Sequence, residues 1–181
     1  MILFEPSVAD YIGGFYDTPN HEFNNKNILS YHTYCPFKNS HAEPTSKVKC
    51  NLIDGLYMAL RYQNIKKLKI GGMMTEFGSV PESKAGIEEI NRVLRYAEKN
   101  WQNWYYWQYK NNSDSTCSSN PSWEHAFYYP NGTVQLKKVH ALSYPYAYAI
   151  CGSPVKQTHD DHSYSLTFKP GTALSQNRKG A

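Results

Sequence analysis

The residues of this chain best suited to chemistry stand at the ends of short apolar runs. Glu76 lies near the end of GGMMTEFG, His32 and Tyr34 lie near the end of LSYHTYC, and Trp107 closes WYYW. A carboxylate can act as a nucleophile, a phenol can donate a hydrogen bond to it, and an indole offers a flat apolar wall. Such a set is typical of a site that cleaves glycosidic bonds, and Glu76 is the predicted nucleophile.

His32, Tyr34 and Trp107 are the predicted substrate-binding residues. His32 and Tyr34 lie two positions apart, so on a strand both side chains face the same side. The Tyr34 hydroxyl could then donate to Glu76 and keep that carboxylate ionised and oriented. The alternative is that both are satisfied polar groups of the core. Trp104 and Trp107 should face opposite sides, and Trp107 is favoured as the sugar-binding wall because it lies nearer the end of its run.

A retaining glycosidase needs a second carboxyl group about 5–5.5 Å from the nucleophile. Glu5, in Phe-Glu-Pro, also lies near the end of an apolar run, and its position does not exclude it. A residue upstream of Met1 is the favoured acid/base. Glu124 and His125, in a later loop, are weaker candidates for substrate contact.

The apolar runs are predicted to be buried parallel strands, because short apolar segments bounded by loops are typical of them. Two helices are expected between the runs. The first covers residues 51–62, and its apolar residues at helical spacing are Leu52, Ile53, Leu56 and Leu60. The second begins at Ser83, and its apolar stripe is Ile87, Ile90, Val93, Leu94 and Ala97. Alternating strands and helices predict an α/β barrel, whose chemistry lies at the carboxyl ends of the strands.

The 181 residues are too few for a complete eightfold barrel, which typically takes about 250. Past the last strand, a further helix is expected within 134–150, β structure from about residue 150, and a disordered tail from Pro170. The chain opens inside a strand-like run, so Met1 is interpreted as an internal methionine of a longer protein.

Composition excludes several functions. The net charge of +4 comes from scattered basic residues without a nucleic-acid-binding motif, so no nucleic acid is expected as a partner. A phosphate-binding glycine loop, a serine nucleophile elbow and a metal-ligand cluster are all missing from the sequence, so neither a cofactor nor a metal is expected. The run from His159 to His162 is interpreted as a solvated turn.

The four cysteines show no CxxC pair. Two glycosylation sequons begin at Asn111 and Asn131. An even cysteine count together with sequons favours an oxidising compartment. Four cysteines can form two disulfides in three ways, and the sequence alone does not decide between them. Because of the proximity of the loops expected to carry them, the predicted disulfides are Cys35 with Cys50 and Cys117 with Cys151.

Several segments together resemble one known family. They are Phe4-Glu5-Pro6, residues 29–35, Met74-Thr75-Glu76-Phe77-Gly78 and residues 106–110. In this order they resemble the second half of endoglycoceramidase-like proteins of glycoside hydrolase family 5. The segment from Leu142 to Pro154 is similar to the junction between that family's barrel and a C-terminal β-sandwich.

The resemblance implies an α/β fold: the C-terminal half of a (β/α)8 TIM barrel in residues 1–145, followed by the beginning of a β-sandwich in residues 146–181. It implies that Glu76 is the nucleophile and that Tyr34 and Trp107 line the sugar-binding subsite. The family's acid/base lies in an Asn-Glu-Pro motif, which this sequence lacks. Thr18-Pro19-Asn20 also stands where members tend to have Pro-Gly-Gly, and the junction lacks the family's arginine.

The function implied by the resemblance is hydrolysis, with retention, of the β-glycosidic bond between an oligosaccharide and ceramide. The implied partners are a glycosphingolipid or other glycan, a peripheral membrane surface, and the missing N-terminal half of the barrel. The implied location is secreted or lysosomal. Two alternatives stay open, namely a non-catalytic carbohydrate- or glycolipid-binding remnant and a related β-glucosidase or glucosylceramidase.

Overall fold

The computed structural model describes residues 1–7, 14–15, 17–110, 123–160 and 163–171. The chain forms two compact units, Met1–Leu142 and Ser143–Ala181. Each unit is described here by itself.

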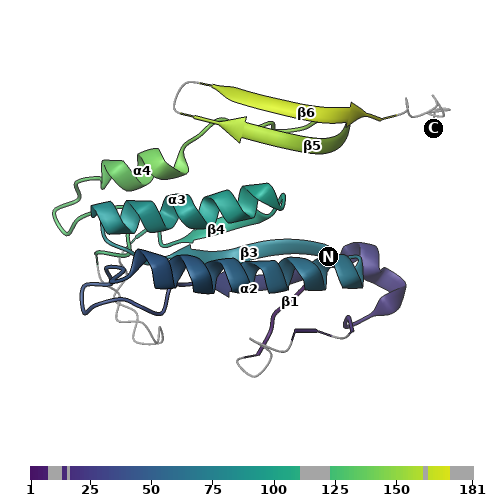
Figure 1. Ribbon diagram of the computed structural model, residues 1–181, viewed down its shortest axis with the longest axis horizontal. Coiled ribbons are helices and arrows are strands. Elements are labelled where there is room, and N and C mark those ends of the chain that lie inside the picture. Colours follow the sequence, from purple (N-terminus) through teal and green to yellow (C-terminus); the bar gives the residue numbers. More distant parts are fainter. Residues whose placement is uncertain (8–13, 16, 111–122, 161–162, 172–181) are drawn as a thin grey trace. The chain divides into compact units, whose positions relative to one another are not determined.

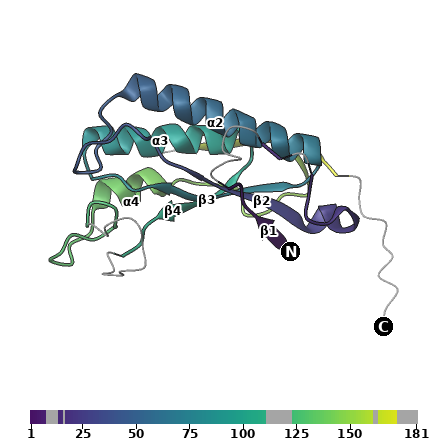
Figure 2. The same ribbon diagram turned by 90° about the horizontal axis from the view of Figure 1, so that it is seen from below.

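The first unit is built on a parallel four-stranded sheet. Its strands are β1 (Ile2–Phe4), β2 (Asn27–Thr33), β3 (Gly71–Gly78) and β4 (Asn103–Trp107), and their order in the sheet follows their order in the chain. Helices α2 (Lys47–Leu68) and α3 (Lys84–Lys99) connect successive strands and lie side by side over one face of the sheet (Figures 1 and 2). This is the arrangement of one half of a (β/α)8 barrel, as predicted.

The predicted helix at Ser83 is confirmed. The Ser83 hydroxyl accepts a hydrogen bond from the Gly86 backbone N–H and caps α3 at its N-terminus. Its apolar stripe is buried against the sheet and is made up of Ile90, Val93, Leu94 and Ala97. Strong amphipathic spacing and a good cap therefore suffice to define this element from the sequence.

The helix predicted over residues 51–62 is present as α2, and it is longer than predicted. It spans Lys47–Leu68, and Ser46 caps it by accepting a hydrogen bond from the Lys49 N–H. Leu52 and Leu56, two of the residues whose spacing predicted the helix, are 59% and 61% exposed. The buried face is instead partly polar and consists of Cys50, Asp54, Tyr57, Met58, Arg61, Asn64 and Ile65.

Contacts with α3 and within α2 make this polar face compatible with burial. Asp54 Oδ2 lies 3.2 Å from a guanidinium nitrogen of Arg92 on α3, and Arg92 also contacts Glu89. Arg61 packs its guanidinium over the Tyr57 ring, 4.9 Å from the ring centroid. A buried ion pair is tolerated only where its charges are matched in this way.

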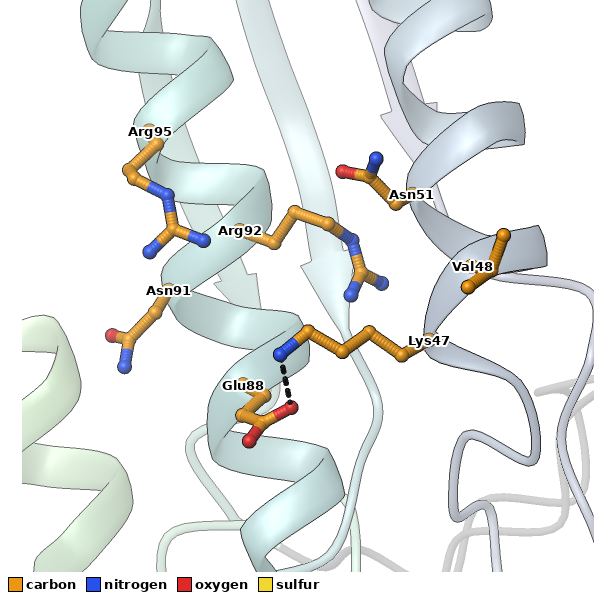
Figure 3. Close-up of a pocket in the computed structure, with 7 residues that line it drawn as sticks. All are labelled: Lys47, Val48, Asn51, Glu88, Asn91, Arg92 and Arg95. Atoms are coloured by element: carbon orange, nitrogen blue, oxygen red, sulfur yellow. Dashed lines mark ion pairs between the residues drawn. The ribbon is translucent and has the colours of Figure 1, made fainter.

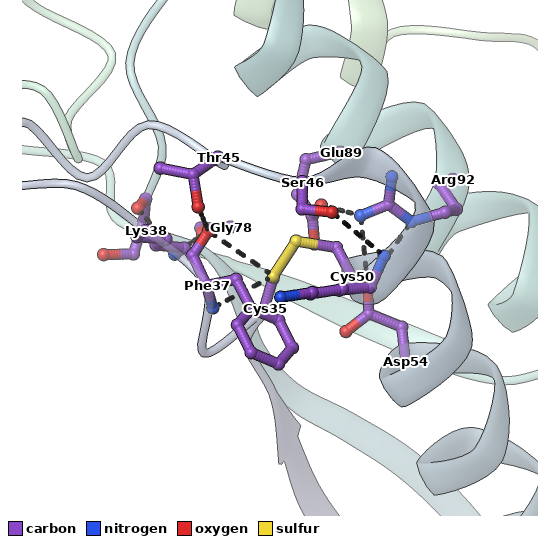
Figure 4. The surroundings of a disulfide bond; sticks show 12 residues. Cys35, Phe37, Lys38, Thr45, Ser46, Cys50, Asp54, Gly78, Glu89 and Arg92 are labelled. Carbon is purple, nitrogen blue, oxygen red and sulfur yellow. Dashed lines mark hydrogen bonds and ion pairs between the residues drawn. A yellow bond between two sulfur atoms is a disulfide. The ribbon is translucent and has the colours of Figure 1, made fainter.

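A disulfide fixes the start of α2 to the end of β2. Cys35 and Cys50 are joined across 15 residues, as predicted, and Glu89, Arg92 and Asp54 surround the bond (Figure 4). Closing such a loop restricts the unfolded chain and is worth about 3 kcal/mol. Cys151 is exposed with a free thiol, so the predicted second disulfide is absent from this structure, and its other cysteine, Cys117, lies outside the described residues.

The remaining elements of the first unit are short. A 3-10 helix, η1 (His21–Lys26), precedes β2, and α4 (Leu136–Leu142) occupies the first part of the region expected to be helical. No helix in the described part of the chain is long and apolar enough to cross a bilayer.

The second unit contains an antiparallel pair, β5 (Gly152–His159) and β6 (Tyr164–Pro170). The predicted change to β structure near residue 150 is therefore confirmed. Asp160 accepts hydrogen bonds from the backbone and hydroxyl of Ser163 in the connecting turn, as expected of a polar turn. Residues 161 and 162 and the tail beyond 171 lie outside the described residues.

Candidate active site

Strands β2 and β3 bring His32, Tyr34 and Glu76 together at the carboxyl edge of the sheet. The pairing of these strands places His32 directly beside Glu76. The Tyr34 hydroxyl donates to Glu76 Oε2 at 2.8 Å, and His32 Nδ1 lies 3.3 Å from the same oxygen. The hydrogen bond expected between Tyr34 and Glu76 is thus present, and the Glu76 side chain keeps about a quarter of its surface exposed to solvent.

Glu5 extends this network through His32. His32 Nε2 lies 3.2 Å from Glu5 Oε1, so the imidazole stands between two carboxylates. Neutral imidazole carries one N–H and can donate to only one of them, whereas imidazolium donates to both. Glu5, just after β1, is therefore brought near the Glu76 carboxylate, with the His32 imidazole between them.

Burial keeps Tyr34 protonated. Burial first, and then the hydrogen bond to Glu76, raises the pKa of the Tyr34 phenol well above its usual range. Tyr34 is therefore a permanent donor at neutral pH. The Tyr34 hydroxyl can therefore hold the Glu76 carboxylate in one orientation, as nucleophilic attack requires.

The two tryptophans of β4 have different surroundings. Trp104 packs edge-on against Phe77, with ring centroids 5.6 Å apart, and Phe77 is fully buried. Phe77 follows Glu76 directly, so Trp104 lies on the face opposite the carboxylate. Trp107 pairs with Gly78 at the carboxyl end of the sheet, and by alternation it lies on the same face as Glu76. Its role as a sugar-binding wall stays a prediction.

Lys38 supports the end of β3 and was not singled out by the sequence. Its ammonium donates to the carbonyl oxygens of Gly78 at 3.1 Å and Ser79 at 2.9 Å, and it lies 5.3 Å from the Tyr34 ring centroid. Burial lowers the pKa of Lys38 to about 8. One lysine thus holds the backbone just after Glu76 and contacts the ring that hydrogen bonds to Glu76. No local pattern marks such a residue, because its partners are backbone carbonyls of a distant segment.

The loop carrying Glu124 and His125 pairs with the chain just beyond Trp107. The carbonyl of His125 accepts a hydrogen bond from the Gln108 N–H at 3.0 Å. Glu124 Oε1 lies 3.2 Å from His41 Nδ1. Burial, followed by the nearby charge of Lys38, lowers the pKa of His125. His125 is thus held next to the chain that follows β4, and Glu124 is held next to His41.

Among the described residues, one group of side chains of metal-binding type is gathered closely, namely Cys35, Cys50 and Glu89. Both sulfur atoms belong to the disulfide and cannot act as thiolate ligands.

The fold and this carboxylate-centred edge are those of one part of an α/β barrel, with polar side chains gathered at the carboxyl ends of its strands. Residues 6–113 match the family Cellulase (glycosyl hydrolase family 5). The match covers more than half of the chain and includes His32, Tyr34, Glu76 and Trp107. The chain belongs to glycosyl hydrolase family 5.

Solved structures of similar fold include endo-glycoceramidase II from Rhodococcus sp. Its lactosyl-enzyme intermediate matches with a TM-score of 0.64 and 21% identity over 82% of this chain and 30% of that one. Its ganglioside GM3 complex matches with a TM-score of 0.62 and 20% identity over 82% of this chain and 31% of that one. At this identity the likeness shows the fold, and the chain spans about a third of the length of these proteins. No curated protein gives a significant match.

Proposed function

We propose that the protein containing this chain is a retaining glycosidase that cleaves the β-glycosidic bond between oligosaccharide and ceramide, with Glu76 as its nucleophile. The observation that supports this most directly is the double contact of Glu76 Oε2 with the Tyr34 hydroxyl and His32 Nδ1 at the carboxyl edge of the sheet. Membership of glycosyl hydrolase family 5 supports the interpretation of this carboxylate as the nucleophile of a glycosidase.

The reaction would proceed in two steps. The Glu76 carboxylate attacks the anomeric carbon, an ester forms, and the bond to the leaving oxygen breaks as an acid protonates that oxygen. Water then attacks the same carbon, the ester bond breaks, and the former acid takes the proton from the water. Tyr34 and His32 hold the carboxylate in position in both steps. The acid/base would come from an earlier barrel strand outside this chain.

The proposed substrate is a glycosphingolipid. The structures of similar fold are named for endo-glycoceramidase and contain lactosyl and ganglioside groups. Trp107, on the Glu76 face at the end of β4, would supply the apolar wall for a sugar ring.

Covalent trapping tests the nucleophile. A 2-deoxy-2-fluoro glycoside forms a long-lived ester with the nucleophile of a retaining enzyme, and digestion with mass spectrometry locates it. In the complete protein we expect the label on the peptide that contains Glu76. Glu76→Gln should abolish both labelling and turnover, whereas Glu22→Gln, a matched change at an exposed site, should leave them intact. A label on another carboxylate, or turnover by Glu76→Gln, would refute the assignment.

Substrate comparison tests the ceramide preference. Hydrolysis of lactosylceramide at the bond to ceramide would support the proposal. Release of glucose from glucosylceramide or from simple β-glucosides alone would favour the β-glucosidase alternative. Binding of glycolipid by the complete protein without any hydrolysis would favour the non-catalytic alternative.

Secretion is proposed on separate grounds. The Cys35–Cys50 disulfide is of the kind that persists in oxidising compartments, and the sequon residue Asn131 is exposed in a turn. The sequon at Asn111 lies outside the described residues. A shift in electrophoretic mobility on deglycosylation, lost in Asn131→Gln, would support this proposal; a fully reduced, unglycosylated protein in cells would contradict it.

A further inference from the structure

Helix α2 carries an exposed apolar stripe that points directly away from the sheet. Val48, Leu52 and Leu56 are 77%, 59% and 61% exposed. Each lies nine residues before a buried residue, and these are Tyr57, Arg61 and Ile65. Nine residues make about two and a half helical turns, so the stripe and the buried face are on opposite sides of the helix.

Neighbouring helices of a barrel do not reach this stripe, because they contact the flanks of α2. On one flank, the Tyr96 hydroxyl of α3 donates to Asn51 Oδ1 at 3.1 Å. The same hydroxyl lies 2.7 Å from where a Cβ on Gly55 would stand. The opposite flank carries Ile53 and Leu60, on the side away from α3. The outward direction between the flanks is left for a partner outside the barrel.

A polar, basic pocket opens beside the first turn of this stripe, between α2 and α3 (Figure 3). Its volume is about 440 Å³, and its lining residues are Lys47, Val48, Asn51, Glu88, Asn91, Arg92 and Arg95. Lys47 and Glu88 form an ion pair of 2.9 Å across it. Lys47 is paired with Glu88 and Arg92 with Asp54, so among the described residues Arg95 is the lining cation for which no ion pair is seen. The two asparagine amides add donors suited to an anion.

Further lysines follow the outward face of α2. Lys49 lies one residue after Val48. Lys66 lies eighteen residues after Val48, which is about five turns, so Lys66 and Val48 are on the same side of the helix. Lys66 and Lys67 are exposed in the last turn. An apolar stripe bordered by lysines is the pattern of helices that lie on anionic membranes, where acyl chains take the apolar residues and phosphates take the cations.

We propose that the outward face of α2 binds anionic phospholipid bilayers, with Val48, Leu52 and Leu56 in the apolar boundary and a headgroup phosphate in the pocket beside Arg95. This surface does not involve Glu76, so it stands apart from the hydrolase activity. It would hold the protein on the lipid layer along the outside of the barrel.

Vesicle sedimentation tests the proposal on the 181-residue chain. We expect binding to phosphatidylcholine vesicles that contain phosphatidylserine, and much weaker binding to phosphatidylcholine alone. Leu52→Gln with Leu56→Gln should weaken binding at least tenfold, because each removes a buried leucine from the apolar boundary. Arg95→Gln should weaken it about fivefold and reduce its salt dependence.

The matched control is Leu136→Gln, which changes an equally exposed leucine on α4 and should leave binding unchanged. All of these sites are exposed, so the urea midpoint of each variant checks that folding is retained.

Three results would overturn the proposal. One is equal binding of the Leu52/Leu56 variant and the Leu136 control. Another is a dimer of the chain, detected by light scattering, that is lost in the Leu52/Leu56 variant, because a second copy would then cover the stripe. The third is loss of vesicle binding when the other half of a family 5 barrel is supplied, because that half would be the true occupant.

Discussion

At the scale of single residues, the Glu76 carboxylate has two neighbours at the carboxyl end of β2, the His32 imidazole and the Tyr34 hydroxyl. Tyr34 is the cleaner of its two partners to remove, because Phe keeps the ring and deletes only the donor. A hydrogen bond to a charged group is worth about 1.5–3 kcal/mol. Tyr34→Phe in the complete protein should therefore lower kcat/KM for a β-glycoside by roughly 10- to 100-fold.

Tyr96→Phe provides the control for this substitution. It also removes a tyrosine hydroxyl that donates a hydrogen bond, but that bond joins α3 to Asn51 on α2. We expect near-normal turnover in Tyr96→Phe. Similar losses in both variants would mean that Tyr34 contributes only to the fold.

Lys138 permits a second prediction at this scale, on pH dependence. It is fully buried on α4, donates to the Ala126 carbonyl at 2.9 Å, and also donates to the Glu124 carbonyl. Burial lowers the pKa of Lys138 to about 7 from 10.5. Between these values the unfolded chain holds a proton that the folded chain has released, so the contribution of Lys138 to stability rises with pH.

Lys138→Met should lower the free energy of unfolding by about 1–3 kcal/mol, because two carbonyl groups lose their donor. The difference from the unmodified chain should grow as the pH is raised from about 7 toward 10, as measured by urea unfolding. Lys137→Met, at the exposed neighbouring position, should change neither quantity. A constant difference across this range would show that Lys138 titrates normally.

At the scale of elements, the end of β3 depends on Gly78. Its φ is +105°, and a Cβ there would lie 2.3 Å from the Tyr106 ring. Tyr106 cannot move aside easily, because it stacks on Phe127 with ring centroids 4.9 Å apart. The strand that carries Glu76 therefore ends in a conformation that requires glycine.

Gly78→Ala and Gly132→Ala form a matched pair, since both positions have positive φ but a Cβ on Gly132 would meet open space. Gly132→Ala should cost about 1 kcal/mol from backbone strain alone. Gly78→Ala should cost at least about 2 kcal/mol, because overpacking against Tyr106 adds to the strain. Equal shifts of the urea midpoint in the two variants would show that the Tyr106 ring moves aside without lowering the free energy of unfolding.

At the scale of the whole molecule, the parallel sheet formed by the described residues has an open edge at β1 and another at β4. β1 and β4 each have one neighbouring strand, whereas a closed barrel pairs every strand on both sides. Open edges expose unpaired backbone groups and promote association. We propose that strands from the other half of the barrel pair with these two edges in the complete protein.

Co-expression tests this reasoning. The 181-residue chain alone should form oligomers by light scattering, and co-expression with a polypeptide that supplies the first four βα units of a family 5 barrel should give a soluble one-to-one complex. A stable monomer that does not bind the added half would contradict this prediction.

Local patterns were sufficient for much of this molecule. The strands and α3 with its cap at Ser83 follow from features that a single segment contains. The placement of Tyr34 beside Glu76 required one further step, the expectation that their two strands are neighbours in the sheet. Apolar runs, helical spacing and strand alternation depend only on neighbours in the chain, so they can be recognised without knowledge of the fold.

Only the tertiary structure decided the orientation of α2 and the roles of Lys38 and Lys138. The apolar spacing of Leu52 and Leu56 marks a helix, but it does not say which side meets the sheet. That side was determined by Asp54, whose charge is matched by Arg92 from another helix. The lysines likewise find their partners in distant backbone carbonyls. Burial of a charge depends on groups brought together by folding, and the sequence around the charge does not contain them.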